Sequence, residues 1–148
     1  MHLPGHTRGH LRLREEGSGA IVAGDLVAGV GTVVIDPPEG DMKEYLASLD
    51  RLLDTKPGCI YPAHGPVIPG GVAKLEQYRE HRLEREERVI GALQKAGRPA
   101  TPFELVPGAY PDVKSDLYPL AERSLIAHLA KLVSEGRVSE RDGRYLLV

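Results

Sequence analysis

The apolar positions of residues 1–69 follow the pattern of short strands. Apolar runs at 11–13 and 20–23 are separated by the turn sequence EEGSG, and this arrangement predicts a β-hairpin. The β-branched run GTVVID predicts a further strand that ends at the double proline Pro37-Pro38. The sequence CIYPAHGPVI predicts a short buried strand that leads into a turn containing a histidine.

Three further stretches repeat their apolar residues at helical spacing. In GDMKEYLASLDRLLDTKPG, Asp41 is the predicted N-cap and Pro57-Gly58 ends the helix. The stretch 72–97 predicts a long helix whose alternating charges form a solvated face, and 118–136 predicts another helix that stops at Gly136. The residues expected on the buried sides of these two later helices are Leu75, Tyr78, Leu83, Ile90 and Leu93, and then Leu120, Leu125, Leu129 and Leu132.

The C-terminal part of the chain has the element order of a winged helix. The proline-containing stretch 98–112 predicts a loop between the two helices, and RVSERDGRYLLV predicts a hairpin that turns at Asp142-Gly143. Helices followed by a terminal β-hairpin are typical of winged-helix domains. The chain is therefore predicted to be α+β, with one domain at 1–69 and a winged-helix-like domain at 70–148.

Composition and charge are those of an ordinary globular protein. The 148 residues are 41% hydrophobic and 27% charged, with a formal net charge of −2. Residues 1–69 carry 6 Lys+Arg and 9 Asp+Glu, and residues 70–148 carry 13 and 12, so the two parts have net charges of −3 and +1. Neither part is basic enough to indicate nucleic-acid binding by charge alone.

The sequence also bears on location and on cysteine chemistry. No apolar run approaches the roughly 20 residues that a membrane span needs, and His2 and Arg8 interrupt any secretory pattern. We therefore expect a cytoplasmic protein with no membrane partner. Cys59 is the single cysteine, which excludes an internal disulfide and a cysteine-rich zinc module. Its apolar neighbour Ile60 indicates a buried small side chain rather than a nucleophile.

Three short motifs place histidine or aspartate beside glycine where a predicted strand ends: GHTRGH at 5–10, AGD at 23–25 and PAHG at 62–65. Imidazole and carboxylate groups bind Zn²⁺, and also iron or manganese where more oxygen ligands are present. One aspartate can bridge two metals, and such a pair activates water. Taken singly, a histidine in such a loop is more often a hydrogen-bonded surface residue, and the aspartate a turn former. Together and in this order, the motifs favour a metal site.

The sequences HLPGHTRGH, AGD, GVGTVVIDPPEGDMKEYLASLDRLL and IYPAHGPVI closely resemble the C-terminal half of the metallo-β-lactamase-fold hydrolases, in particular the beta-lactamase-like protein 2 subgroup. The resemblance continues through HRLERE, TPFELV and LIAHLAKLVSEGRV, because that family carries a small winged-helix-like domain after its metal domain. It implies the second half of a metallo-β-lactamase αββα sandwich followed by a winged-helix-like domain built of helices and a β-hairpin.

The resemblance also implies roles for individual residues. His6 would bind the first metal, His64 the second, and Asp25 would bridge the two as the catalytic carboxylate. His10 would support these ligands rather than bind metal, and His2 occupies a position that is not a ligand. The implied cofactor is one or two zinc ions, with manganese or iron as alternatives.

The chain departs from the family at one essential motif. The family's metal site also uses an HxHxDH signature from the first half of the fold, and this sequence contains no HxH. Three ligands shared between two metals leave each metal under-coordinated, and the strands would leave an apolar face uncovered. The chain would thus be a truncated fragment of a longer hydrolase, one part of a split protein whose second chain brings HxHxDH, or a self-associating homo-oligomer without the chemistry. We expect little or no activity from the chain alone.

The leading hypothesis is a metal-dependent hydrolase of an ester, a thioester, an amide or a phosphodiester. By resemblance, its substrate would be single-stranded RNA or a small molecule such as a thioester or a β-lactam. Aromatic residues, on which single strands stack, make up only 5% of the chain. Four arginines recur at three-residue spacing, but the glutamates between them indicate a solvated face: Arg79, Arg82, Arg85 and Arg88.

A second hypothesis is a non-catalytic module in which the winged-helix-like domain binds nucleic acid. Alternatively, that domain packs beside the active site and shapes substrate access. His128 lies among leucines and is expected to pack rather than to bind metal. The recognition helix would span 117–135, and the cations facing phosphates would be Arg123 and Lys131 on the helix and Arg137, Arg141 and Arg144 on the wing.

Overall fold

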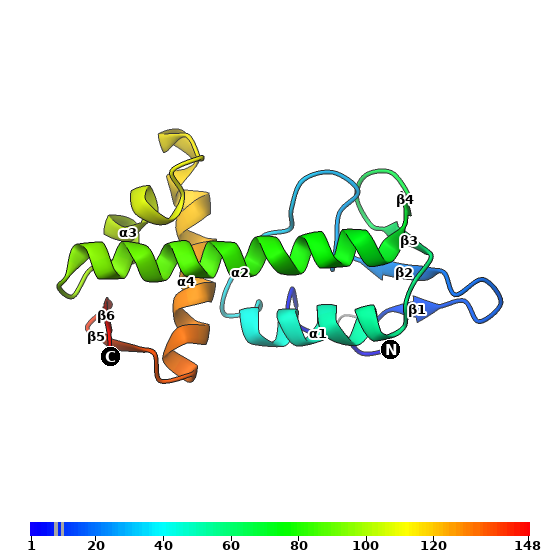
Figure 1. Cartoon of the computed structure of the whole chain (residues 1–148), viewed down its shortest axis with the longest axis horizontal. Helices are drawn as coiled ribbons and strands as arrows, with labels where there is room; N and C mark the ends of the chain where they lie inside the picture. Colours follow the sequence, from blue (N-terminus) through cyan, green and yellow to red (C-terminus); the bar gives the residue numbers. More distant parts are fainter. Residues whose placement is uncertain (8, 10) are drawn as a thin grey trace. The chain divides into compact units, whose positions relative to one another are not determined.

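The computed structural model describes residues 1–7, 9 and 11–148, and it divides into two compact units. Unit 1 is Met1–Arg82 and unit 2 is Leu83–Val148. The long helix α2 (Gly71–Ala96) begins in unit 1 and ends in unit 2 (Figure 1). The predicted domain boundary after residue 69 falls just before this helix, whereas the two compact units divide within it. The boundary therefore stays a prediction.

Unit 1 contains a four-stranded sheet in the order β1-β2-β3-β4. β1 and β2 pair antiparallel, β2 and β3 run parallel, and β3 and β4 pair antiparallel. The predicted hairpin and the predicted strand CIYP are thereby confirmed. Ile21 and Ala23 of β2 and Ile60 of β3 point into the core, as alternation along a strand requires. The strands are β1 (Leu13–Arg14), β2 (Ile21–Gly24), β3 (Cys59–Pro62) and β4 (Ile68–Pro69).

Helix α1 (Met42–Asp54) forms where the leucine spacing predicts it. Asp41 is its N-cap, and its Oδ1 accepts a hydrogen bond of 2.9 Å from the backbone N–H of Glu44. Tyr45 and Leu49 lie on the face that is fully buried. This face contributes to the core of unit 1, and burying residues of this size stabilises the unit by about 2 kcal/mol each.

The strand predicted over GTVVID does not form: within the described chain, residues 31–36 carry no strand. The backbone carbonyl groups of this segment bind side chains instead of a neighbouring strand. The Val33 carbonyl accepts a hydrogen bond from Arg82, and the Val34 carbonyl lies 3.0 Å from His6 Nδ1. These partners are distant in sequence, so the β-branched pattern alone gave the wrong prediction.

Unit 2 has the element order of a winged helix around one hydrophobic core. The predicted hairpin β5–β6 forms, and it turns at Asp142 and Gly143, whose φ angles are 52° and 72°. None of the described helices has the length and apolar composition needed to cross a membrane. The elements after α2 are α3 (Pro102–Ala109), η1 (Ser115–Leu117), α4 (Tyr118–Ser134), β5 (Val138–Arg141) and β6 (Arg144–Leu147).

Helix α3 occupies the stretch 98–112, where a loop was predicted, so that prediction is wrong. The Thr101 side chain accepts from the Glu104 N–H and the Glu104 carboxylate accepts from the Thr101 N–H, which together form a capping box. Pro102 stands in the first turn of the helix, where a proline is tolerated. The sequence therefore contained a helix-start signal, T-x-x-E with proline after the threonine. The several prolines of the stretch nevertheless led to the prediction of a loop.

The predicted buried faces of α2 and α4 are correct for most leucines and wrong for Leu83 and Leu120, which are exposed. Arg82, Arg85 and Glu86 are buried instead, so the prediction that they belong to a solvated face is also wrong. These charged side chains find partners inside their own units, which offsets the cost of removing them from water.

Arg85 illustrates this compensation. Its guanidinium binds Asp112 through two hydrogen bonds of 2.8 and 3.0 Å and also donates to the carbonyl of Ala109. It lies 4.3 Å from the centroid of the Tyr110 ring. The hydrogen bonds from Arg85 hold the pKa of Asp112 well below its ordinary value.

We expect Asp112→Asn to lower the free energy of unfolding by about 1 kcal/mol at neutral pH, because it removes the charge that faces a buried guanidinium. A carboxylate with a lowered folded-state pKa stabilises fully above its ordinary pKa of 3.8. That contribution is lost as the pH falls from there through the folded-state pKa. Urea unfolding of both proteins over a pH series measures this, with the exposed Asp116→Asn as control. A difference that persists unchanged in acid would contradict the assignment.

Candidate metal site of unit 1

Asp25 and His64 lie side by side at one edge of the sheet. Asp25 directly follows β2 and His64 comes soon after β3, and these neighbouring strands run parallel, so their carboxyl ends meet. His64 Nε2 is 3.3 Å from Asp25 Oδ1. The His64 side chain is 81% exposed and the Asp25 side chain 31%, so both donor groups are open to an ion from solvent.

The two loops that carry this pair are fastened to each other through their backbones. The N–H of Gly29 donates to the carbonyl of His64 at 2.9 Å, and the N–H of Ala63 donates to the carbonyl of Gly24 at the same distance. A Cβ at Gly29 would lie 2.4 Å from the carbonyl oxygen of Pro66. Only glycine permits this approach, and the position of His64 therefore depends on it.

His6 lies on a loop held against the start of α1. The carbonyl of Gly5 accepts from the N–H of Asp41 at 2.8 Å, and Ser48 Oγ donates to the carbonyl of Pro4 at 2.6 Å. His6 Nδ1 is 3.0 Å from the Val34 carbonyl. Because a carbonyl only accepts, Nδ1 carries the proton in this contact, and Nε2 is the nitrogen with a lone pair in the neutral ring.

Of the predicted ligands, the structure thus pairs Asp25 with His64. Among the described residues, no group of three or more His, Cys, Asp or Glu side chains could hold a metal, so His6 does not complete such a group. His10, predicted to support the ligands, lies outside the described residues.

Arg12 is a buried cation beside the Asp25 turn that sequence reasoning missed. Its side chain is almost fully buried, and a Cβ at Gly24 would lie 3.6 Å from Arg12 Nη1. Burial lowers the pKa of Arg12, while its electrostatic interactions with Asp25 and Tyr45 act in the opposite direction. The leucines on either side of Arg12 are exposed, whereas alternation in the sequence would have placed the leucines inward and Arg12 in solvent, so no sequence signal identified it.

The remaining candidate residues lie elsewhere. Cys59 is half-buried on β3 rather than fully buried. His128 is fully buried in unit 2, with Nδ1 3.8 Å from Oε2 of Glu86, as expected of a packing residue. Burial would raise the pKa of Glu86, but hydrogen bonds from His128 and Lys131 outweigh burial, so the pKa is lowered.

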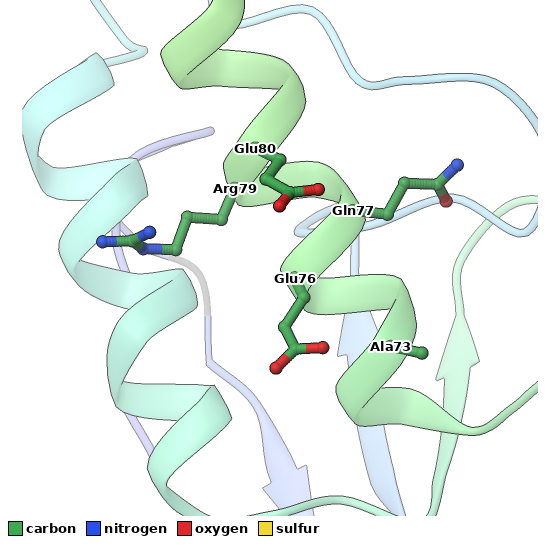
Figure 2. Close-up of a pocket in the computed structure, with 5 residues that line it drawn as sticks. All are labelled: Ala73, Glu76, Gln77, Arg79 and Glu80. Atoms are coloured by element: carbon green, nitrogen blue, oxygen red, sulfur yellow. The ribbon is translucent and has the colours of Figure 1, made fainter.

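A hollow on the first turns of α2 contains none of the predicted ligands. Figure 2 shows the Arg79 side chain extended toward α1, where its Nε donates to Asp50 Oδ1 at 2.7 Å. The hollow has a volume of about 480 Å³ and is lined by Ala73, Glu76, Gln77, Arg79 and Glu80.

Comparisons with known proteins cover both units. Residues 1–64 match the family model described as the metallo-beta-lactamase superfamily, and residues 101–144 match the beta-lactamase associated winged helix domain. A solved metallo-beta-lactamase family protein from Thermus thermophilus is 27% identical with a TM-score of 0.82. This alignment covers 100% of the chain and 48% of that protein.

Curated relatives are similar over nearly the whole chain. The beta-lactamase-like protein 2 homolog of Drosophila melanogaster is 34% identical over 93% of the chain and 46% of its own length. The atrochrysone carboxyl ACP thioesterase of Aspergillus chevalieri is 35% identical over 94% of the chain and 46% of its own length. The chain therefore spans about half the length of these curated relatives.

Proposed function

The chain belongs to the metallo-beta-lactamase superfamily, and from that premise we propose that it is part of a metal-dependent hydrolase whose metal ligands here are Asp25, His64 and His6. The predicted resemblance and fold class, a metallo-β-lactamase fold followed by a winged helix, are confirmed by the family matches. The observation that carries the proposal is the 3.3 Å pair of Asp25 and His64 at the ends of adjacent parallel strands.

The residues present fit a divalent metal such as zinc, with manganese or iron as alternatives. Asp25 offers a carboxylate and His64 an imidazole Nε2 toward the same exposed point. His6 donates from Nδ1 to a backbone carbonyl, which is the support that metal-binding histidines usually have. A bound metal supplies a Lewis acid that activates water and polarises the substrate bond. Asp25 and the two histidines bind and orient that group.

The proposed site needs further ligands. Three donors are too few for two metals that each require about four, and among the described residues no three His, Cys, Asp or Glu side chains come together as a metal-binding group. We therefore place the remaining ligands, in the form of an HxHxDH motif, on a segment outside this chain, supplied by a longer protein or by a second chain. Activity of the chain alone is expected to be very low.

An exposed apolar row across the sheet supports the proposal of a missing partner. Leu13 is paired with Val22 and Val22 with Tyr61, so the three side chains lie in register on one face of β1, β2 and β3. They are 68%, 51% and 47% exposed. A second sheet packed on this face would bury them, as in a two-sheet sandwich.

Without that second sheet, we expect the chain to self-associate through this row. Sedimentation velocity at increasing protein concentration should show oligomers of the wild type, whereas Val22→Asp should remain monomeric because a carboxylate cannot be buried there unpaired. Val148→Asp, at an exposed position in unit 2, is the control and should behave as the wild type. A wild-type chain that stays monomeric throughout would contradict a docking role for the row.

Among substrates, we favour an ester or thioester over single-stranded RNA. Two curated relatives carry the name of a thioesterase, and few aromatic residues are available for stacking bases. Parallel assays of a thioester and of a single-stranded RNA, with the metal-loaded protein completed by an HxHxDH segment, test this choice. Cleavage of the RNA without hydrolysis of the thioester would reverse this preference.

The second candidate function, nucleic-acid binding by the winged helix, has the family match at 101–144 in its favour. The ion pairs of unit 2 weigh against it. Lys131 and Arg137 both pair with Glu86, and Arg144 pairs with Glu104. These cations are therefore partly neutralised. A steep loss of binding with added salt would distinguish phosphate contacts from other binding.

A further inference from the structure

The segment that follows Asp25 has no regular structure but is held at many points. Residues 26–34 contain neither helix nor strand. Tyr45 of α1 donates from its hydroxyl to the Leu26 carbonyl at 2.8 Å. Two side chains of α2, Tyr78 and Arg82, bind the rest of the segment. All of these contacts lie within unit 1.

Tyr78 binds the middle of the segment. Its hydroxyl accepts from the N–H of Ala28 at 3.0 Å and lies 2.8 Å from the Gly31 carbonyl and 3.3 Å from the Ala28 carbonyl. With one proton to donate, the hydroxyl makes its shorter bond to Gly31. Burial raises the pKa of Tyr78, so the hydroxyl stays protonated at neutral pH.

Arg82 binds the end of the segment, next to the carbonyl that His6 uses. Arg82 donates to the Val33 carbonyl, and His6 Nδ1 bonds to the Val34 carbonyl. The segment is therefore held at two successive carbonyl groups, by α2 at Val33 and by the His6 loop at Val34. The buried Arg82 guanidinium also lies 5.3 Å from the centroid of the Tyr45 ring.

We propose that Tyr78 and Arg82 are positioning residues for the metal ligands: Tyr78 fixes the loop that follows Asp25 and meets the His64 loop, and Arg82 fixes the backbone that orients His6. The two residues are four apart on α2, so they project from one side of the helix. This inference rests on the proposed function, since it assigns the two residues a role at the same site.

Tyr78→Phe tests the first half of the inference, because the ring stays and only the hydroxyl is lost. Hydrogen exchange measured by NMR should be at least about tenfold faster at the Ala28 amide. Mn²⁺ added to the wild-type protein should broaden the His64 resonances. In Tyr78→Phe about tenfold more Mn²⁺ should be needed, as for other residues that support metal ligands. Tyr145→Phe, which removes a hydroxyl from unit 2, is the matched control.

Arg82→Lys tests the role of Arg82 in orienting His6. It is also the alternative variant if Tyr78→Phe does not fold. A lysine retains the charge but lacks the planar fork, so broadening of the His6 ring by Mn²⁺ should weaken while Tyr78 still protects Ala28. Unchanged exchange at Ala28 and unchanged broadening in Tyr78→Phe would overturn the inference. A wild type that shows no broadening would instead contradict the proposed metal site, and Ala28 exchange would still decide whether Tyr78 holds the loop.

Discussion

Asp25→Ala is expected to abolish metal binding at the site and to lower the hydrolytic rate of the completed, metal-loaded protein by at least about a hundredfold. Loss of a residue that only supports a ligand costs about 10- to 100-fold in affinity or activity, so loss of a proposed ligand itself should cost no less. The carboxylate has no replacement nearby, because no cluster of further acidic or histidine ligands surrounds it among the described residues.

The experiment compares three aspartate and histidine variants with the wild type. Mn²⁺ or Co²⁺ titration by calorimetry measures affinity, and the thioester assay measures rate. His64→Ala should resemble Asp25→Ala, since the two side chains form one pair. Asp54→Ala removes an exposed aspartate at the end of α1 and should leave both quantities unchanged. Metal affinity retained in Asp25→Ala would remove Asp25 from the site.

Gly5→Ala is expected to lower the free energy of unfolding of unit 1 by about 4 kcal/mol. Gly5 has a φ of +126°, which side chains rarely adopt, and a Cβ there would lie 2.3 Å from the backbone N and Cα of Tyr45. Backbone strain and overpacking each cost about 1–3 kcal/mol, and here both apply. Because Tyr45 belongs to α1, the loop cannot move away without losing its contact with the helix.

Denaturant unfolding followed by NMR signals of unit 1 measures this loss. Gly9→Ala is a matched control on the same loop, because a Cβ at Gly9 meets nothing within 4 Å. If unit 1 remains folded at low temperature, Gly5→Ala should still displace the adjacent His6 and weaken metal binding. An unchanged unfolding midpoint would show that the loop does not pack against Tyr45.

Elements that depend on local signals could be predicted from the sequence. The Asp41 cap of α1 and the Asp142-Gly143 turn of the terminal hairpin need only neighbouring residues, and both form as predicted. The segment GTVVID does not form a strand, because Arg82 and His6 bind its carbonyl groups from far along the chain. Arg85 can be buried because it forms hydrogen bonds with Asp112, which lies 27 residues later in the chain. No local charge pattern could reveal this partner.

The residues of the candidate site also differ in whether local sequence signals or distant contacts position them. Asp25 and His64 could be assigned to one site from the motifs AGD and PAHG, each of which lies beside a glycine where a predicted strand ends. The structure adds that the two strands run parallel and end at a common edge. Arg12 and Tyr78 could not be assigned to the site from the sequence, since each looks like an ordinary member of a strand or helix pattern. Their contacts with the Asp25 turn and its loop arise only from the tertiary fold.

The most direct test of the proposed site is the metal affinity of this chain before and after it is mixed with a separately expressed segment that carries HxHxDH, of the kind that the resemblance implies for the first half of the fold. We expect weak binding by the chain alone, a gain of at least about 100-fold in the complex, and loss of that gain in Asp25→Ala. Tight binding by the chain alone that survives Asp25→Ala, or a complex that forms without any gain in affinity, would contradict it.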